Sequence, residues 1–204
     1  ISKIDKYDFL FAKELGYSIK ILSIASNKLN KIEQRVHPCF VKLNSDIAKI
    51  NNEINAVVVS DSVIGKNIFE GPGAGAGPTG ASVMSDLMDI IRGTYNYPLG
   101  VSMKKKKKLK IQKIDDLSFP YYLRITAKDK AGVMAKISKA LSKRKISIES
   151  IIQKPSKRSN FAEIILITHT VKESSLLSSI KQIKRLPEVS SSVKFIRIED
   201  SLWP

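Results

Sequence analysis

The sequence contains very little cysteine: Cys39 is the only one among 204 residues. A single cysteine cannot form a disulfide within the chain, and this usage is typical of a reducing compartment. Long apolar runs are missing too, since no stretch approaches the ~18 to 20 residues that span a bilayer, and no signal-peptide pattern is present. These absences exclude a disulfide-stapled domain, and we expect a soluble, cytoplasmic protein with no membrane partner.

Histidine is also scarce, and His37 has no Asp, Glu or Cys companion at a spacing typical of metal sites or catalytic triads. His37, in the string RVHP, has two interpretations. It is either a proton carrier or substrate ligand, or a structural residue at a strand edge, which Pro38 favours. We expect His169 to be structural, Cys39 to fill the core, and no metal to be bound.

Acidic residues are few, with 19 Asp and Glu against 35 Lys and Arg, which gives a formal charge of +16. Residues 1–103 are nearly balanced, with 11 basic and 10 acidic side chains, so the excess lies in the second half. It is concentrated in the lysine run 104–108, which contains no aromatic residue or arginine. We therefore interpret 94–119 as an exposed, lysine-rich linker and expect no nucleic-acid partner, with an anionic partner as the alternative.

Hydrophobic periodicity divides the first part of the chain into alternating helices and strands. In chain order, the predicted elements are a helix over 4–15, strands over 17–25 and 31–41, a helical turn over 46–50, strands over 56–59 and 64–69, and a helix over 78–93. They predict a mixed or antiparallel sheet with flanking helices. Because the chain begins inside a helix and without methionine, we expect it to be a piece of a longer protein.

Four alternate glycines, Gly71, Gly73, Gly75 and Gly77, stand before the last of these helices. Such a loop lets the backbone approach a bulky or anionic group, because no Cβ intrudes and the helix start offers unpaired N–H groups. The spacing matches neither G-x-G-x-x-G nor G-x-x-x-x-G-K-[ST], so a tight structural turn and a ligand loop both stay open. Pro78 is expected to be the first helical residue, where its missing N–H is harmless.

The second half of the chain has the order βαββαβ. In sequence, it comprises a strand over 121–128, a turn over 129–132, a helix over 133–144, strands over 146–153 and 161–170, a helix over 174–186 and a strand over 193–198. This order predicts a ferredoxin-like sheet with both helices on one face. Since 161–167 is apolar on both sides, we expect the second face to be covered as well.

The strings NAVVV and FEGPGAGAGPTGASVMSDLMDIIRG, with FAKELGYSIKILSIA and RVHP upstream, resemble the homoserine dehydrogenase family over 1–93. The resemblance implies part of that family's substrate and dimerisation domain. It also implies that Gly75, with Gly73 beside it, approaches the nicotinamide cofactor, NADP or NAD. We assign no catalytic residue, because the family's catalytic lysine and aspartate and its nucleotide-binding domain would precede Ile1. We therefore expect no activity from this chain alone.

The string YYLRITAKDKAGVMAKISKALSKRKISIESIIQK resembles the ACT domain, an amino-acid-sensing module, which we assign to 120–204. Its signature loop consists here of Asp129, Gly132 and Val133, with Ala131 where proline is usual. Asp129 can accept a hydrogen bond from an ammonium group, and the helix start after Gly132 suits a carboxylate. These three residues form the predicted effector site, with threonine as the leading candidate.

Together the resemblances imply a homoserine dehydrogenase of α+β type with an ACT domain. It would interconvert L-homoserine and L-aspartate 4-semialdehyde in threonine and methionine biosynthesis, as a homo-oligomer. Two alternatives stay open: a non-enzymatic ACT-type regulatory protein, and an RNA-binding βαββαβ domain. The first would not need the loop at Gly73 and Gly75. The second would need stacking aromatics on its central strands, where Tyr122 and Phe161 are the candidates.

Overall fold

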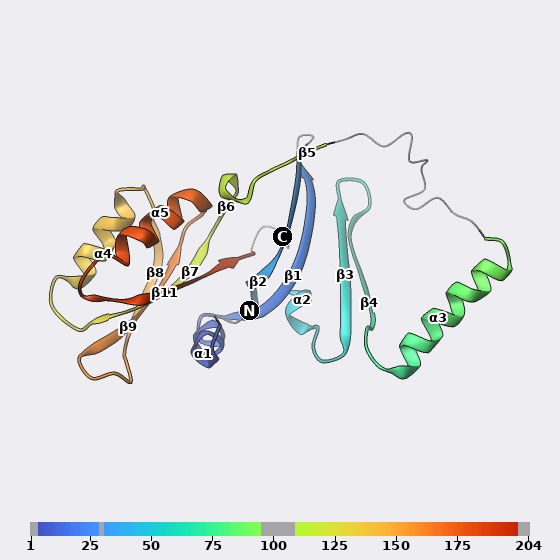
Figure 1. Cartoon of the computed structure of the whole chain (residues 1–204), viewed down its shortest axis with the longest axis horizontal. Helices are drawn as coiled ribbons and strands as arrows, with labels where there is room; N and C mark the ends of the chain where they lie inside the picture. The colour runs from blue at the N-terminus through green and yellow to red at the C-terminus, as the bar shows by residue number, and fades with distance from the viewer. Residues whose placement is uncertain (1–3, 29–30, 95–108, 200–204) are drawn as a thin grey trace. The chain divides into compact units, whose positions relative to one another are not determined.

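The computed structural model describes residues 4–28, 31–94 and 109–199. They fall into two compact units, one of Ile1–Leu43 with Leu109–Pro204 and one of Asn44–Lys108, and each is described by itself (Figure 1). The lysine run 104–108 lies outside the described residues. Among the described residues, no helix combines the length and the apolar character needed to cross a membrane.

The first unit is built on a mixed seven-stranded sheet. Across the sheet the strands are β1 (Tyr17–Lys28), β2 (Lys31–Lys42), β11 (Val189–Ile198), β7 (Tyr121–Lys128), β9 (Phe161–Thr168) and β8 (Ile148–Pro155), with β5 (Lys110–Ile111) paired to β2. Its helices are α1 (Lys6–Glu14), η3 (Ile114–Asp116), α4 (Val133–Ser142) and α5 (Glu173–Ile183). The order β11-β7-β9-β8, with α4 and α5 on one face, confirms the predicted ferredoxin-like plan (Figure 1).

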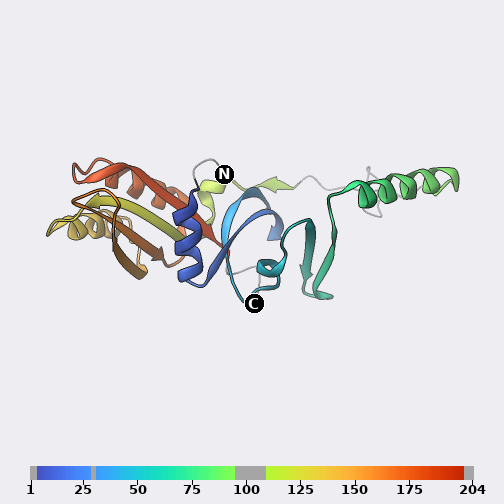
Figure 2. The ribbon, with the colours of Figure 1, turned by 90° about the horizontal axis from the view of Figure 1, so that it is seen from below.

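Alternation along the strands gives this sheet two apolar faces. On β7, Tyr121, Leu123 and Ile125 pack in the core beneath α4 and α5, while Tyr122 belongs to a second cluster on the other face. That second cluster includes Ala12 of α1, with Phe11 of the same helix and Leu15, its C-cap, packed against it. The expected cover of the second face is therefore supplied by α1 and β2, which come from the start of the chain (Figure 2).

Strand β2 joins the two halves of the sequence in one sheet. It pairs with β1 antiparallel along its whole length, and with β11 in parallel at Cys39 and Phe40. The ring of Phe40 lies 4.6 Å from that of Tyr122. β1 and β2 consequently pack with the βαββαβ half, in one compact unit.

The predicted linker is structured where the chain is described after residue 108. β5 pairs with β2, and β6 (Ser118–Phe119) pairs with β10 (Val171–Lys172). Leu117 and Phe119 are both buried in the core under α4 and α5. Most of residues 110–118 are exposed, as expected of a connector, and the chain is anchored at its end by the two buried side chains.

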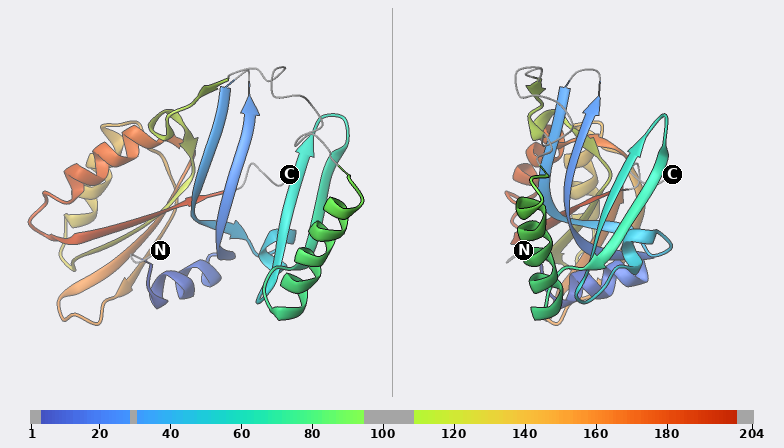
Figure 3. Two further views of the ribbon diagram at one scale, coloured as in Figure 1. Left: turned by 45° about the vertical axis from the view of Figure 1, so that its right-hand side comes forward. Right: turned by 90° about the vertical axis from the view of Figure 1, so that its right-hand side faces the viewer.

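The second unit contains a short helix α2 (Asp46–Lys49), a hairpin of β3 (Ile54–Asp61) and β4 (Gly65–Pro72), and helix α3 (Ala76–Ile91) (Figure 3). The hairpin turn is closed by Asp61, whose carboxylate accepts the N–H groups of Val63 and Ile64. Pro78 is the third residue of α3 rather than the first. Its missing N–H is still harmless there, since the first four N–H groups of a helix lack internal partners.

Candidate functional site

The glycine loop lies in the second unit, between β4 and α3. Gly75 is the N-cap of α3 and has φ +113°, a conformation that L side chains rarely adopt. Its carbonyl accepts the N–H of Thr79, while the N–H groups of Ala76 and Gly77 have no backbone acceptor among the described residues. The loop therefore presents unpaired donors at the positive end of a 16-residue helix.

Gly73 is needed for a different reason. Its N–H donates to the carbonyl of Glu53 at 2.9 Å, and a Cβ at this position would overlap the side-chain amide of Asn55. Gly73 and Gly75 are both exposed in the second unit. The structure thus brings together the two glycines that the sequence singled out, one fixed by its backbone angle and one by close packing.

The loop of the ACT-like half lies in the first unit, between β7 and α4. Gly132 has φ +83° and is the N-cap of α4. Asp129 is exposed; its N–H donates to the carbonyl of Asn160, and its carboxylate accepts from Gln153 at 3.1 Å. The carboxylate and the helix start thus lie three residues apart, as the sequence predicted.

Val133 fits the effector role less well than its neighbours. Its side chain is buried in the core, and its N–H donates to the carbonyl of Lys130 at 3.3 Å. The N–H groups of Met134 and Ala135 have no backbone acceptor among the described residues. These two N–H groups are the donors that α4 offers to an anion. The sequence motif did not single them out, and the geometry at the start of the helix does.

A buried polar network that sequence reasoning missed joins β2 to the end of β11. Arg35 donates to both carboxylate oxygens of Glu199, at 2.9 and 2.8 Å, and to Nε2 of His37 at 3.0 Å. It also contacts Glu33 and lies 4.6 Å from the centre of the Phe119 ring. No local pattern in the sequence could reveal this pair, because Arg35 and Glu199 are 164 positions apart.

A second ion pair continues the network into the ACT-like half. Arg197 on β11 pairs with Glu173, the first residue of α5, and Glu173 also accepts the Tyr121 hydroxyl at 2.7 Å. Burial raises the pKa of the Tyr121 hydroxyl, and its bond to Glu173 raises it further. A carboxylate at the first helical turn is also favoured by the helix dipole.

His37 is neutral in this network. Burial, with the nearby Arg197 and Arg35, lowers the pKa of His37 to about 4, against the opposing effect of the Pro38 carbonyl. Since Nε2 accepts from Arg35, Nδ1 carries the proton and faces the Pro38 carbonyl at 3.2 Å. This geometry favours the structural interpretation of His37, although β2 lies between β1 and β11 in the sheet order rather than at its edge.

Ligand atoms of His37, Cys39 and Glu199 lie within 4.8 Å of one another, a grouping that spacing in the sequence did not show. The donors are poorly suited to a metal ion. Arg35 already occupies both oxygens of Glu199 and Nε2 of His37, and burial raises the pKa of the Cys39 thiol to about 12. Because a thiol must lose its proton to bind a metal well, the cluster is a structural one.

Comparison with known proteins gives matches along the whole chain. Residues 1–88 match the family model for homoserine dehydrogenase, and residues 121–188 match the model for the ACT domain. The chain is 37% identical to the homoserine dehydrogenase of Helicobacter pylori over 98% of its length, and 34% identical to that of Bacillus subtilis over 100%. These matches cover 47% of each relative, so the chain spans about half their length.

A solved structure agrees with these relatives. The crystal structure of a homoserine dehydrogenase from Thiobacillus denitrificans matches with a TM-score of 0.86 and 33% sequence identity, over 98% of this chain and 46% of that one. The matches define a chain in which a segment of a dehydrogenase family is followed by an ACT domain. Within that class, residues 1–88 belong to the homoserine dehydrogenase family, and the whole chain is similar to the carboxy-terminal portion of homoserine dehydrogenases.

Proposed function

We propose that the protein of which this chain is part interconverts L-homoserine and L-aspartate 4-semialdehyde with NADP or NAD, in the cytoplasm. The observation that carries the proposal is the match of 98% of the chain, at 37% identity, to one homoserine dehydrogenase. The buried free thiol of Cys39 supports a reducing compartment. The proposal concerns the complete protein, since this chain corresponds to about half of that relative.

In this proposal, Gly75 and Gly73 border the nicotinamide cofactor. The exposed loop, the positive φ of Gly75 and the unpaired N–H groups of Ala76 and Gly77 support the assignment. The cofactor supplies the hydride chemistry, and the loop provides close backbone approach and donors. No side chain of this chain is given a catalytic role.

The test is to join this chain to the part of the Helicobacter pylori enzyme that it does not match. We expect the fusion to reduce NADP or NAD in the presence of L-homoserine, and the unfused chain to show no turnover. Gly75→Val in the fusion should raise the KM for the dinucleotide, because a branched side chain would stand where backbone must approach. A folded fusion with no homoserine-dependent turnover would contradict the proposal.

We also propose that the ACT domain binds a small amino acid, with threonine as the leading candidate, at a contact between two copies. Asp129 would accept from the ammonium group, and the N–H groups of Met134 and Ala135 would hold the carboxylate. The exposure of Asp129 and the left-handed Gly132 support this assignment. The homo-oligomer that this requires is part of the same proposal.

A further inference from the structure

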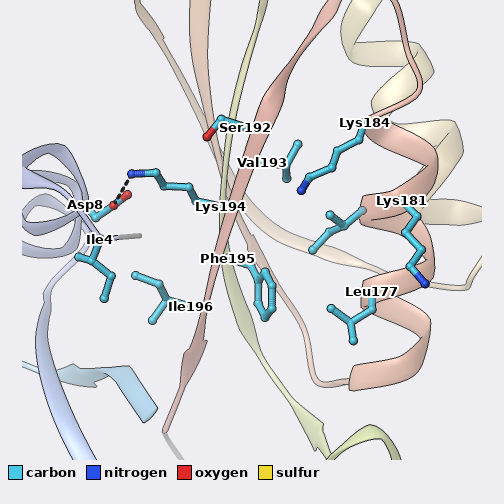
Figure 4. A pocket seen from close by; sticks show the side chains of 11 residues that line it. Ile4, Asp8, Leu177, Lys181, Lys184, Ser192, Val193, Lys194, Phe195 and Ile196 are labelled. Carbon is cyan, nitrogen blue, oxygen red and sulfur yellow. Dashed lines mark hydrogen bonds and ion pairs between the residues drawn. The ribbon is translucent and has the colours of Figure 1, made fainter. Parts of the chain in front are cut away.

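A cavity of about 630 Å³ lies between α1, α5 and the middle of β11, all within the first unit (Figure 4). Ile4 and Asp8 line it from α1 and its approach, and Leu177 and Ile180 line it from α5. Phe195 closes it along β11. Its size falls within the range of small-molecule sites, and its walls are mainly apolar.

The charges around this cavity are only partly balanced. Lys194 is paired with Asp5 at 2.6 Å and Asp8 at 3.4 Å, and Figure 4 shows it directed at α1. Lys181 and Lys184 also line the cavity, and the ammonium group of neither has an ion-pair or hydrogen-bond partner among the described residues. In Figure 4, Lys184 extends from α5 toward β11. An excess of positive charge therefore borders an apolar space.

The other negative groups near the cavity are already neutralised. Asp8 is fully buried, lies 2.9 Å from Nε of Arg124 and accepts the Tyr122 hydroxyl at 3.2 Å. Ion pairs with Lys194 and Arg124 hold the pKa of Asp5 below its usual range, although burial opposes them. Neither carboxylate is free to compensate Lys184.

The strand that forms the floor of the cavity has an open edge. Ile198 directs its N–H toward β7, and the next N–H, that of Glu199, points toward β2. Because successive residues of a strand point their N–H groups to opposite sides, Val193 and Phe195 direct theirs away from β7. Among the described residues, β2 pairs with β11 only at Arg197 and Ile198. The edge beside the cavity thus offers backbone hydrogen-bonding groups that β2 does not use.

We propose that this cavity binds a small molecule with an apolar body and one anionic group, a carboxylate or a phosphate. Ile4, Leu177, Ile180 and Phe195 contact the body, and the ammonium group of Lys184 pairs with the anion. The site is separate from the loop of Asp129 and Gly132, because no residue of that loop lines the cavity. Occupancy also bridges α1 and α5, so the ligand stabilises the packing of the amino-terminal helix on the ACT domain.

The test uses the full chain and four probes that divide the ligand chemistry: octanoate, octyl phosphate, 1-octanol and acetate. We expect octanoate or octyl phosphate to raise the melting temperature and to shift the backbone NMR signals of Val193, Lys194 and Phe195. Octanol should bind more weakly because it lacks the charge, and acetate because it lacks the apolar body. An added pentapeptide strand that shifts these signals while neither anion does would indicate a peptide edge instead and overturn the proposal.

Matched variants separate the cavity from general charge effects. Lys184→Gln should weaken octanoate binding roughly fivefold, the upper range for one exposed ion pair. Arg185→Gln removes the same charge from the next residue, which does not line the cavity, and should leave binding unchanged. Leu177→Gln tests the apolar wall and should weaken octanoate and octanol alike. Equal octanoate affinity in wild type and Lys184→Gln, or equal protection by octanol and octanoate, overturns the proposal.

Discussion

At the residue scale, the strongest backbone constraints lie at two glycines that start helices. Gly75 and Gly132 both have positive φ, at +113° and +83°, and both are N-caps without a capping side chain. Glycine costs no steric strain there, and it leaves the helix N–H groups uncovered for a ligand. The same residue type thus serves cofactor approach in one unit and effector binding in the other, under the functions proposed above.

Replacing Gly75 should destabilise α3 by about 1 to 2 kcal/mol, because an L residue at this φ is strained. Gly80→Ala is the matched control: it lies inside α3, a Cβ there meets nothing within 4 Å, and the change should stabilise the helix by about 0.5 to 1 kcal/mol. Urea denaturation of each variant, monitored by far-ultraviolet circular dichroism, measures whether its free energy of unfolding rises or falls. Destabilisation of similar size in the two variants would show that φ at Gly75 is not the cause.

The neutral His37 makes stability depend on pH. Its pKa is lowered from 6.5 to about 4 in the folded chain, so the unfolded chain binds the extra proton between these values. The free energy of unfolding therefore falls as the pH drops below 6.5, by about 2 kcal/mol between pH 7 and pH 5.

Denaturant titrations at both pH values test this dependence. His37→Gln keeps an acceptor for Arg35 but cannot titrate, so its loss of stability over the same interval should be smaller than that of the wild type. An equal pH dependence in the two proteins would assign the effect to other groups.

The sequence predicts a candidate site residue where the reason for that residue is local. The glycine loop, Asp129 and Gly132 stand out because a backbone angle or a helix start dictates them. The Arg35–Glu199 pair was not predictable, since its partners meet only through the pairing of β2 with β11. The same long-range pairing explains why Glu199 was missed as a neighbour of His37.

At the scale of elements, the start of α4 is the part of the ACT domain best suited to a zwitterion. Its two unpaired N–H groups belong to Met134 and Ala135, one turn from the carboxylate of Asp129. Burial of Val133 fixes the helix against the sheet, so these donors are held in place before any ligand arrives. Preorganised donors lose little entropy on binding.

Threonine should therefore raise the melting temperature of the chain, and Asp129→Asn should reduce this effect by weakening the ammonium contact. Asp115→Asn is the control, an exposed acid in η3 outside the loop. Calorimetric titration with threonine, methionine, lysine and branched-chain amino acids ranks the ligands. If none of them releases or absorbs heat, the ACT domain serves only a structural role.

At the scale of the whole molecule, helix α3 carries a long apolar stripe. None of its side chains is buried within the described residues. Large apolar side chains recur on one side of the helix, namely Val83, Met84, Leu87, Met88 and Ile91. Exposed contiguous apolar surface of this kind is characteristic of association sites.

We expect the isolated chain to self-associate through this stripe. Leu87→Glu places a charge in its centre and should lower the sedimentation coefficient at a given concentration, because burial of a charge opposes association. Asp86→Lys changes the charge of the neighbouring residue outside the stripe and should have little effect. Wild-type chain that sediments as a monomer at all concentrations would contradict this expectation.

The parallel pairing of β2 with β11 also governs when the protein can fold during synthesis. The hairpin of β1 and β2 is synthesised well before its partner strand β11, because Arg35 and Glu199 are 164 positions apart. At ~5 to 20 residues per second, that interval lasts roughly 10 to 30 s. Until it ends, the edge of β2 lacks its β11 partner and Arg35 lacks the carboxylate of Glu199.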